Sequence, residues 1–213
     1  MATNADFRPG RFAREFTERW RTLTDRWSER PGTSIGTLGP AGTSSQLAAA
    51  PIAARYGLRV ELFPSFDDVL EHLIERKVEL ALVPSAYRGL TRFHWHRDLR
   101  LRAYFPEATP DYGLAAPADG TVPTAGPVSI ASMWEVRWMY DQLIPEDLED
   151  RDVRWVDADS TQHAAAIVAR GGADLALTNA PGRAAHELRW LATRPGAEVI
   201  WALFGHAADV TGR

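Results

Sequence analysis

The sequence predicts an α/β protein built as two similar lobes with a ligand cleft between them. Residues 33–83 alternate apolar strand and amphipathic helix in the order of a βαβαβ unit, and residues 128–178 repeat that order. A glycine-containing loop rich in hydroxyls follows the first strand, at the edge of the sheet where such folds bind ligands. A chain of 213 residues is long enough to bury the core of one large domain or of two lobes.

The N-terminal segment, residues 1–31, is predicted to be an amphipathic helix that is accessory to the main domain. Apolar side chains recur at intervals of three and four, with charged residues between them, at Phe12, Phe16, Trp20, Leu23 and Trp27. Pro31 and Gly32 end the helix. We expect this stripe to pack on the main domain, residues 32–213, or on a second subunit, which makes a homodimer a possible assembly.

The loop at residues 37–45 is the first candidate site. The strand 33–37 precedes it, Pro40 and Gly42 turn the chain, and a hydroxyl residue caps the helix that comes next. The first N–H groups of a helix have no partner within the helix and attract anions. Gly42, Thr43, Ser44 and Ser45 are therefore candidates for holding a carboxylate or phosphate, although any α/β protein needs a capped turn here. No lysine follows the last glycine, so a nucleotide loop is disfavoured.

The rest of the first lobe supplies a second loop at the same edge. Strands at 59–63 and 79–83 flank a helix that runs from Ser65 through Ile74. Residues 84–89 follow the third strand, so Ser85 and Tyr87 are expected beside the first loop. We assign about residues 32–108 together with 196–213 to the first lobe, and about 109–195 to the second.

The second lobe is predicted to face the first with similar chemistry. Its predicted elements are strands at 128–131, 153–156 and 175–178 and helices at 134–143, 161–169 and 183–191. Thr161 and Gln162 open one helix with a hydroxyl-rich start, and Thr178 and Asn179 end a strand as Ser85 does in the first lobe. A last strand at 199–204 is expected to return to the first lobe, which gives two crossings between the lobes.

Composition excludes several classes of function. The net charge is −4 and no basic run stands outside the N-terminal helix, so no nucleic-acid partner is expected. No apolar run reaches membrane-spanning length, and no leader-like start is present, which favours a cytoplasmic protein without a membrane partner. Cysteine is absent, which excludes thiolate catalysis and disulfides. His94 and His96 stand two apart without a second ligand cluster, so no metal is expected.

The motifs and their order over residues 33–206 resemble the prephenate dehydratase domain. The resemblance is carried by residues 37–45, by Phe63-Pro64-Ser65-Phe66-Asp67-Asp68-Val69 and by Ser160-Thr161-Gln162-His163-Ala164-Ala165. It implies a pair of lobes like a type 2 periplasmic binding protein, with prephenate, a dicarboxylate, in the cleft. The anchors that it suggests agree with those chosen from the residues.

Two departures from the dehydratase pattern change the implied reaction. Val199-Ile200-Trp201 stands where the dehydratases carry Thr-Arg-Phe, and residues 83–89 replace a longer Glu-Asn-Ser segment. Both departures resemble the prephenate decarboxylases of the bacilysin type, from antibiotic and other specialised pathways. This closer resemblance implies loss of the ring carboxylate without aromatisation, giving a dihydro-4-hydroxyphenylpyruvate. Two alternatives stay open: a dehydratase with Thr91-Arg92-Phe93 folded into the cleft, and a non-catalytic ligand-binding module.

The implied chemistry assigns roles to a few side chains. Val199 and Ile200 offer the ring hydroxyl no proton donor, so they are expected to control selectivity against aromatisation. Tyr87 is the first choice as the donor of a proton to ring carbon, with an aromatic packed at the lobe edge as the equal alternative. His163 could also reach the ligand, although a solvated helix residue is the simpler interpretation. No cofactor is expected, because the reaction gives a Schiff-base lysine or thiamine no obvious task.

Overall fold

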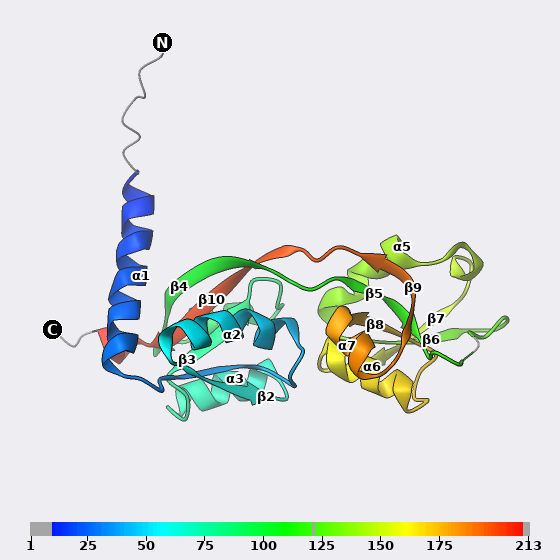
Figure 1. Cartoon of the computed structure of the whole chain (residues 1–213), viewed down its shortest axis with the longest axis horizontal. Coiled ribbons are helices and arrows are strands. Elements are labelled where there is room, and N and C mark those ends of the chain that lie inside the picture. Colours follow the sequence, from blue (N-terminus) through cyan, green and yellow to red (C-terminus); the bar gives the residue numbers. More distant parts are fainter. Residues whose placement is uncertain (1–9, 121, 211–213) are drawn as a thin grey trace, which may run out of the picture.

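The computed structural model describes residues 10–120 and 122–210, which form two five-stranded sheets joined by two crossing segments (Figure 1). We call the part around the first sheet lobe 1 and the part around the second sheet lobe 2. The elements of lobe 1 are α1 (Arg11–Glu29), β1 (Ser34–Leu38), α2 (Ser44–Tyr56), β2 (Arg59–Phe63), α3 (Phe66–Ile74), β3 (Leu80–Pro84), α4 (Leu90–Trp95), β4 (Leu99–Ala108), β10 (Glu198–His206) and the 3₁₀ helix η3 (Ala207–Val210).

Lobe 2 is formed by the chain between the two crossings. Its elements are β5 (Tyr112–Ala116), β6 (Val128–Ser132), the 3₁₀ helix η1 (Trp134–Met139), α5 (Tyr140–Leu143), the 3₁₀ helix η2 (Glu146–Leu148), β7 (Val153–Asp157), α6 (Thr161–Ala169), β8 (Leu175–Asn179), α7 (Ala180–Ala185) and β9 (Arg189–Arg194). The two sheets have the strand orders β2-β1-β3-β10-β4 and β7-β6-β8-β5-β9. The predicted α/β fold of two lobes is therefore confirmed.

Each sheet has helices on both faces, which explains why its central strands are largely apolar and buried. In lobe 1 one core lies between the sheet and α3 with α4, and a second core lies under α2 and the C-terminal part of α1. In lobe 2 the η1–α5 segment covers one face and α6 covers the other. Every residue of β1, β5, β6 and β8 is buried.

The last strand completes the first sheet. β10 runs antiparallel between β3 and β4, with Phe204 opposite Ala81 on one side and Leu101 on the other. Trp201 and Phe204 are fully buried on opposite faces of the sheet. The sequence-based expectation that this strand returns to the first sheet is confirmed.

The two crossings between the lobes run side by side in Figure 1 and are tied to each other by hydrogen bonds. Thr109 N–H donates to the carbonyl of Ala197 at 2.9 Å, and Ala197 N–H donates to the Thr109 hydroxyl at 3.0 Å. Gly196 N–H donates to the Asp111 carboxylate at 3.0 Å. The lobes are therefore joined by one paired connection and not by two independent linkers.

Two sequence-based predictions about elements are corrected. The helix expected over residues 183–191 ends at Ala185, and residues 189–194 form the edge strand β9, which pairs antiparallel with β5. The helix expected over residues 134–143 is a 3₁₀ helix followed by one α-helical turn. In both cases the apolar residues suit either structure, and the pairing or packing partner decides between them.

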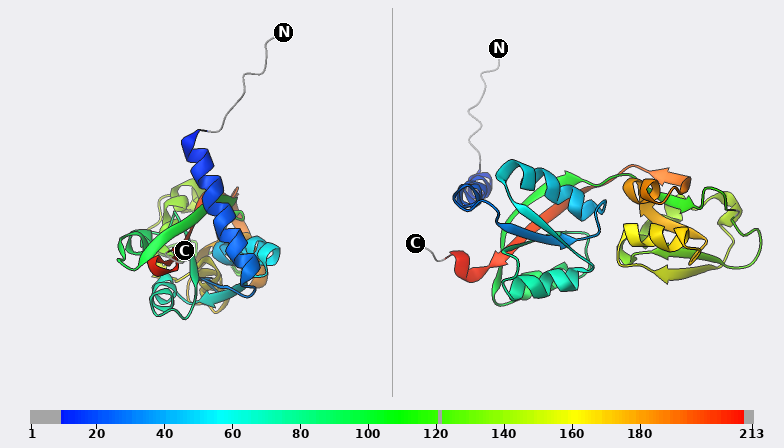
Figure 2. Two further views of the ribbon diagram at one scale, coloured as in Figure 1. Left: turned by 90° about the vertical axis from the view of Figure 1, so that its left-hand side faces the viewer. Right: turned by 60° about the horizontal axis from the view of Figure 1, so that its bottom comes forward.

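The N-terminal helix uses its apolar stripe within the chain. Trp20 Nε1 donates to the carbonyl of Tyr104 at 3.0 Å, Trp27 is 2% exposed, and the Phe16 ring lies 5.0 Å from that of Tyr104. Figure 2 shows α1 leaning across lobe 1 beside α2. The side chain of Phe12 lies outside the described residues. Since the stripe packs on its own sheet, it gives a homodimer no support, and that assembly stays a prediction. Across the described ranges no helix is long and apolar enough to span a membrane.

Candidate active site

The loop after β1 begins the candidate site. Gly39 N–H donates to the carbonyl of Phe63 at 2.8 Å, which fixes the end of the strand. The Thr43 hydroxyl donates to the carbonyl of Leu38 at 2.7 Å and accepts from Gln46 N–H at 3.2 Å, so it caps α2. Thr43 is 2% exposed, and its hydroxyl is engaged in these two hydrogen bonds and not available to a ligand. What remains for a ligand here is the N-terminus of a 13-residue helix, with its unpaired backbone N–H groups.

Gly42 brings this loop against lobe 2. Its carbonyl accepts from Asn179 Nδ2 at 3.0 Å, and its φ of +87° is a conformation that favours glycine. A β-carbon at this position would lie 2.5 Å from Gln162 Nε2. Asn179 in turn accepts from Gln162 Nε2 at 3.3 Å and from Gly182 N–H at 2.9 Å. Three of the predicted site residues, Gly42, Gln162 and Asn179, thus meet at one contact between the lobes.

Ser44 makes a second contact between the lobes. Its Oγ lies 2.6 Å from the hydroxyl oxygen of Tyr112, the first residue of β5, and Tyr112 is 8% exposed. Burial raises the pKa of Tyr112, and its hydrogen bonds with Ser44 and Thr109 oppose that rise. Sequence analysis did not select Tyr112 and missed its place opposite Ser44. Tyr112 could have been selected from its position, because it begins the first strand after the chain crosses between the lobes.

The other predicted anchors are less available to a ligand. Ser45 and Thr161 are each 4% exposed, and the Thr178 hydroxyl donates to the carbonyl of Thr161 at 2.7 Å. Ser85 is exposed, and its N–H donates to the carbonyl of Ile200 at 2.7 Å. Thr161 and Thr178 therefore brace α6 against β8, and Ser85 is the one of these four that solvent reaches.

Tyr87 lies in the loop after β3, packed on the start of α3. Its ring centroid is 4.5 Å from that of Phe66, and its hydroxyl donates to Asp67 Oδ1 at 3.3 Å. Burial is the main cause that raises the pKa of Tyr87, and the Asp67 carboxylate adds to it. The hydroxyl therefore stays protonated above the ordinary tyrosine range. Tyr87 therefore remains a candidate both for a proton donor, since its hydroxyl is half-buried, and for a packing residue, since its ring packs on Phe66.

The same loop also reaches lobe 2. Arg88 N–H donates to Glu135 Oε1 at 3.4 Å, and the Arg88 guanidinium lies 3.8 Å from that oxygen and stacks over the Trp134 ring. The Glu135 side chain is only 12% exposed. Sequence analysis did not select Glu135, because nothing in the η1 segment distinguishes it from any acidic residue on a helix.

Val199 and Ile200 project to opposite faces of the first sheet. Val199 packs against the core under α1 and α2, whereas Ile200 is 50% exposed. They pair with Glu107 and Pro106 of β4. The two side chains therefore point in different directions, because neighbouring residues of a strand alternate between its faces. Their role in selectivity stays a prediction.

The remaining candidates lie on α4 and at the start of α6. Thr91-Arg92-Phe93 lies on α4, with Phe93 1% exposed in the core and Arg92 paired with Asp67. His163 Nδ1 lies 3.1 Å from Asp159 Oδ2 at the start of α6. Within residues 10–120 and 122–210, no group of three His, Asp or Glu side chains could hold a metal ion.

A groove of about 520 Å³ runs along the contact between the lobes. Lobe 1 lines it with Gly39, Pro40, Ala41 and Pro64, and lobe 2 lines it with residues that include Gln162, His163 and His186. Sites for small ligands commonly measure about 300–1,000 Å³, so this groove can hold a compact dicarboxylate. Tyr87 and residues 43–45 at the start of α2 do not line this groove. We treat the groove, the α2 N-terminus and the Tyr87 loop together as the candidate active site, as the sequence predicts.

Comparison with known proteins identifies the family. The chain is 31% identical over 183 residues to a prephenate decarboxylase of Bacillus subtilis strain 168, covering 81% of this chain and 86% of that protein. A prephenate decarboxylase of Planktothrix agardhii is 30% identical over 184 residues, with 80% and 86% covered. The chain belongs to the prephenate decarboxylase family. No protein-family model matches the chain.

Solved structures support the fold of this family member. A prephenate dehydratase of Arthrobacter aurescens, solved in complex with L-Phe, superposes with a TM-score of 0.59 at 19% identity. The alignment covers 81% of this chain and 60% of the dehydratase chain. A periplasmic domain of Bordetella pertussis BvgS gives a TM-score of 0.55 at 13% identity, over 88% of this chain and 86% of that domain. At these identities the likeness concerns the fold alone, and it confirms the predicted fold, which dehydratase and periplasmic-binding-protein domains share.

Proposed function

We propose that the chain removes the ring carboxylate of prephenate as CO2 and leaves the ring non-aromatic. The observation that carries this proposal is the 31% identity to a prephenate decarboxylase over 81% of the chain. The finer statement, that the product is a dihydro-4-hydroxyphenylpyruvate, rests on the residues of the late strand. Val199 and Ile200 stand where the dehydratase pattern has a hydroxyl and a guanidinium.

Loss of CO2 from the quaternary ring carbon leaves an electron pair with two possible outlets. In the first, the pair expels the ring hydroxyl as water after protonation and the ring becomes aromatic. In the second, the pair moves through the adjacent double bond, and the far carbon of that bond takes a proton. Because hydroxide leaves poorly, the first outlet needs an acid at the hydroxyl, and a well-placed acid contributes about 10²–10⁴-fold in rate. A valine and an isoleucine supply none.

The contacts of the candidate site support a division of tasks. The N-terminus of α2 offers N–H groups to a substrate carboxylate, and Ser44 adds a hydroxyl. Gln162 and Asn179 hold the opposite lobe against this loop through Gly42. We assign Tyr87 as the donor of the proton to ring carbon, since its half-buried hydroxyl remains protonated at neutral pH. Gly42, Thr43, Ser45, Ser85, Thr161 and Thr178 complete the proposed substrate-binding set, several of them as supports.

The dehydratase alternative is weakened by one observation. It needs Thr91-Arg92-Phe93 in the cleft, but Phe93 anchors this triplet in the core of lobe 1. The binding-module alternative shares the fold with periplasmic domains such as that of BvgS, so fold alone does not separate it from an enzyme.

Proton NMR of a reaction with prephenate tests the proposed function. We expect release of CO2 together with vinylic ring-proton signals and a retained carbinol proton. Aromatic signals of phenylpyruvate as the main product would establish the dehydratase. Saturable binding of prephenate without CO2 release would establish the binding module.

The double variant Val199→Thr with Ile200→Arg tests the origin of selectivity. Since Ile200 is half-exposed, an arginine there keeps contact with water and avoids the cost of a buried charge. We expect phenylpyruvate to appear beside the dihydro product, measured by its ultraviolet absorbance and by NMR. Ile200→Arg alone is the matched control, because it adds the charge without the hydroxyl. An unchanged product ratio in a folded double variant would place selectivity elsewhere, most simply in the Tyr87 loop.

A further inference from the structure

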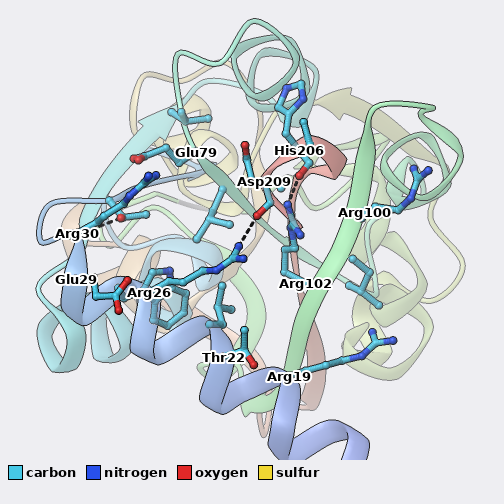
Figure 3. Close-up of a pocket in the computed structure, with 18 of the residues that line it drawn as sticks. Arg19, Thr22, Arg26, Glu29, Arg30, Glu79, Arg100, Arg102, His206 and Asp209 are labelled. Atoms are coloured by element: carbon cyan, nitrogen blue, oxygen red, sulfur yellow. Dashed lines mark hydrogen bonds between the residues drawn. The ribbon is translucent and has the colours of Figure 1, made fainter. Parts of the chain in front are cut away.

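A second cavity lies at the end of lobe 1 that faces away from lobe 2. It measures about 1240 Å³ and is walled by α1, by the starts of β3 and β4 and by the end of β10 with η3 (Figure 3). Its largest group of side chains is a set of arginines, namely Arg19, Arg26, Arg30, Arg76, Arg100 and Arg102. None of the residues assigned to the candidate active site lines it.

Three of these arginines are held by backbone carbonyls and not by carboxylates. Arg26 donates to the carbonyl of Asp209 and Arg102 to that of His206, so that in Figure 3 both guanidinium groups converge on the C-terminal turn. Arg100 donates to the carbonyls of Arg97 and Leu99 at 2.9 and 2.6 Å. Within the described ranges, none of the three forms an ion pair with a carboxylate.

Three acidic residues of the cavity are engaged with other groups. The Glu79 carboxylate accepts from Ser34 N–H at 2.6 Å and from the Ser34 hydroxyl at 3.1 Å. Asp209 pairs with Arg76 at 3.2 Å, and Glu18 lies 3.9 Å from Arg21. Glu15 and Glu29 also line the cavity, so five carboxylates stand against six guanidinium groups and the lining carries one surplus positive charge.

The surroundings of Arg102 favour its charged form less than water does. Burial is the main cause that lowers the pKa of Arg102, Asp209 opposes it, and the neighbouring Arg26 and Arg100 lower it further. A charged group that is taken from water and placed beside like charges is costly, and an anion held between them removes that cost.

We propose that this cavity binds a small molecule with at least two anionic groups, carboxylates or phosphates, between Arg26, Arg100 and Arg102. Guanidinium groups match both kinds of anion through paired N–H donors. A cavity of about 1240 Å³ is large for a single inorganic anion, which favours an organic ligand with separated charges. The site is separate from the candidate active site and does not depend on the proposed decarboxylation.

Isothermal titration calorimetry of the full chain, with pyrophosphate and separately with citrate, tests this site. We expect saturable binding of at least one probe with one site per chain, weakened as salt rises because the contacts are ionic. Tighter binding of pyrophosphate would identify a phosphate-bearing ligand, and tighter binding of citrate a polycarboxylate. Absence of saturable binding by both probes would overturn the proposal.

Variants locate the binding. Arg102→Gln and Arg26→Gln should each weaken it about tenfold or more, because each removes a charge-assisted contact. Arg59→Gln is the matched control: it also removes one charge from lobe 1, but on β2, outside the cavity. Ser44→Ala should leave binding unchanged, whereas a loss there would assign the probe to the active-site cleft and overturn the proposal.

Circular dichroism of each variant checks that it folds. Arg102 ties the C-terminal turn to β4, so Arg102→Gln could unfold that turn. In that case Arg100→Gln decides, since its carbonyl partners lie within three residues on its own segment. Equal weakening by Arg100→Gln and Arg59→Gln would show attraction by net charge only and would reject a defined site.

Discussion

Lobe 1 and lobe 2 share one arrangement of strands and helices, which we call the frame, and the likeness extends to individual hydrogen bonds. In lobe 1 the Glu79 carboxylate accepts from the N–H and hydroxyl of Ser34, and in lobe 2 Asp174 does the same for Ser129. The two residues of each pair are 45 positions apart in both lobes. The helices α3 and α6 also begin alike, with the hydroxyls of Ser65 and Ser160 accepting from the N–H three residues on.

The lobes differ in the helix that comes after the first strand of this frame. Lobe 1 continues into α2, a 13-residue helix whose N-terminus points at the contact between the lobes, whereas lobe 2 continues into the 3₁₀ helix η1. Lobe 1 therefore offers backbone N–H groups to a ligand, and lobe 2 offers side chains such as Tyr112, Gln162 and Asn179. Two lobes with the same frame can thus bind one ligand in different ways, lobe 1 with backbone groups and lobe 2 with side chains.

The two tyrosines at the site give the sharpest test of this difference. We expect Tyr87→Phe, in lobe 1, to lower kcat by about 10²–10⁴-fold with little change in KM, as loss of a proton donor should. Tyr112→Phe, in lobe 2, should mainly raise KM, because it removes the contact with Ser44. Steady-state kinetics with prephenate measures both. Equal effects of the two changes on kcat would contradict the division between the lobes.

The pH profile adds a second measurement to this comparison. The pKa of Tyr87 is raised, mainly by burial, so its hydroxyl keeps the proton as pH passes the ordinary tyrosine value of about 10. If Tyr87 is the donor, kcat should decrease only at pH values above about 10, where the Tyr87 hydroxyl loses its proton. This decrease should be absent from the pH profile of Tyr87→Phe. A decrease that persists in this variant would return Tyr87 to a packing role.

The contact between the lobes can be broken at one glycine. Gly42→Ala places a β-carbon 2.5 Å from Gln162 Nε2, so the lobes must separate or shift, and misplacement of about 1 Å can cost on the order of 10²-fold in turnover. Gly57→Ala is the matched control, since its φ is also positive, at +65°, but it has no atom within 4 Å. Both variants should lose about 1–2 kcal/mol of stability from backbone strain. Only Gly42→Ala should lose turnover, and similar losses in both would exclude the contact as the cause.

The shared frame itself predicts the smallest effects. Asp174→Ala should lower the free energy of unfolding by about 2 kcal/mol, because the N–H and hydroxyl of the buried Ser129 lose their acceptor. Glu79→Ala should cost less, since Glu79 is exposed and water can take the place of its carboxylate beside Ser34. Urea unfolding of the two variants measures the difference. A larger loss in Glu79→Ala than in Asp174→Ala would contradict this expected order.

Much of the fold could be predicted because strands and helices alternate with clear turns. The periodicity of Val69, Leu70 and Leu73 and the caps at Thr43, Ser65 and Ser160 mark helices that the structure contains. The segment 189–194 could not be assigned in this way, because its strand depends on pairing with β5, far earlier in the chain. Propensity is local, and such pairing is not.

The candidate site was predictable where loops follow strands and less so elsewhere. Gly42 and Asn179 were selected for their place at strand ends, and the structure brings them into contact. Tyr112 and Glu135 were missed because their value lies in the partners opposite them, Ser44 and Arg88. Thr43 and Thr178 were expected to bind ligand, but backbone partners already occupy their hydroxyls. A sequence shows which residues have hydrogen-bonding groups and not which of these groups are already used.

The position of β10 has a consequence for the order in which the protein folds during synthesis. β10 is made after β1 to β9, yet it lies inside the first sheet between β3 and β4. Lobe 2, with all five of its strands between residues 112 and 194, is therefore complete on the ribosome before lobe 1 can close. Until residue 206 emerges, β3 and β4 each expose an unpaired edge and the pockets that Trp201 and Phe204 fill. The N-terminal lobe thus finishes second, and a stalled or truncated chain would carry a finished lobe 2 beside an open, aggregation-prone lobe 1.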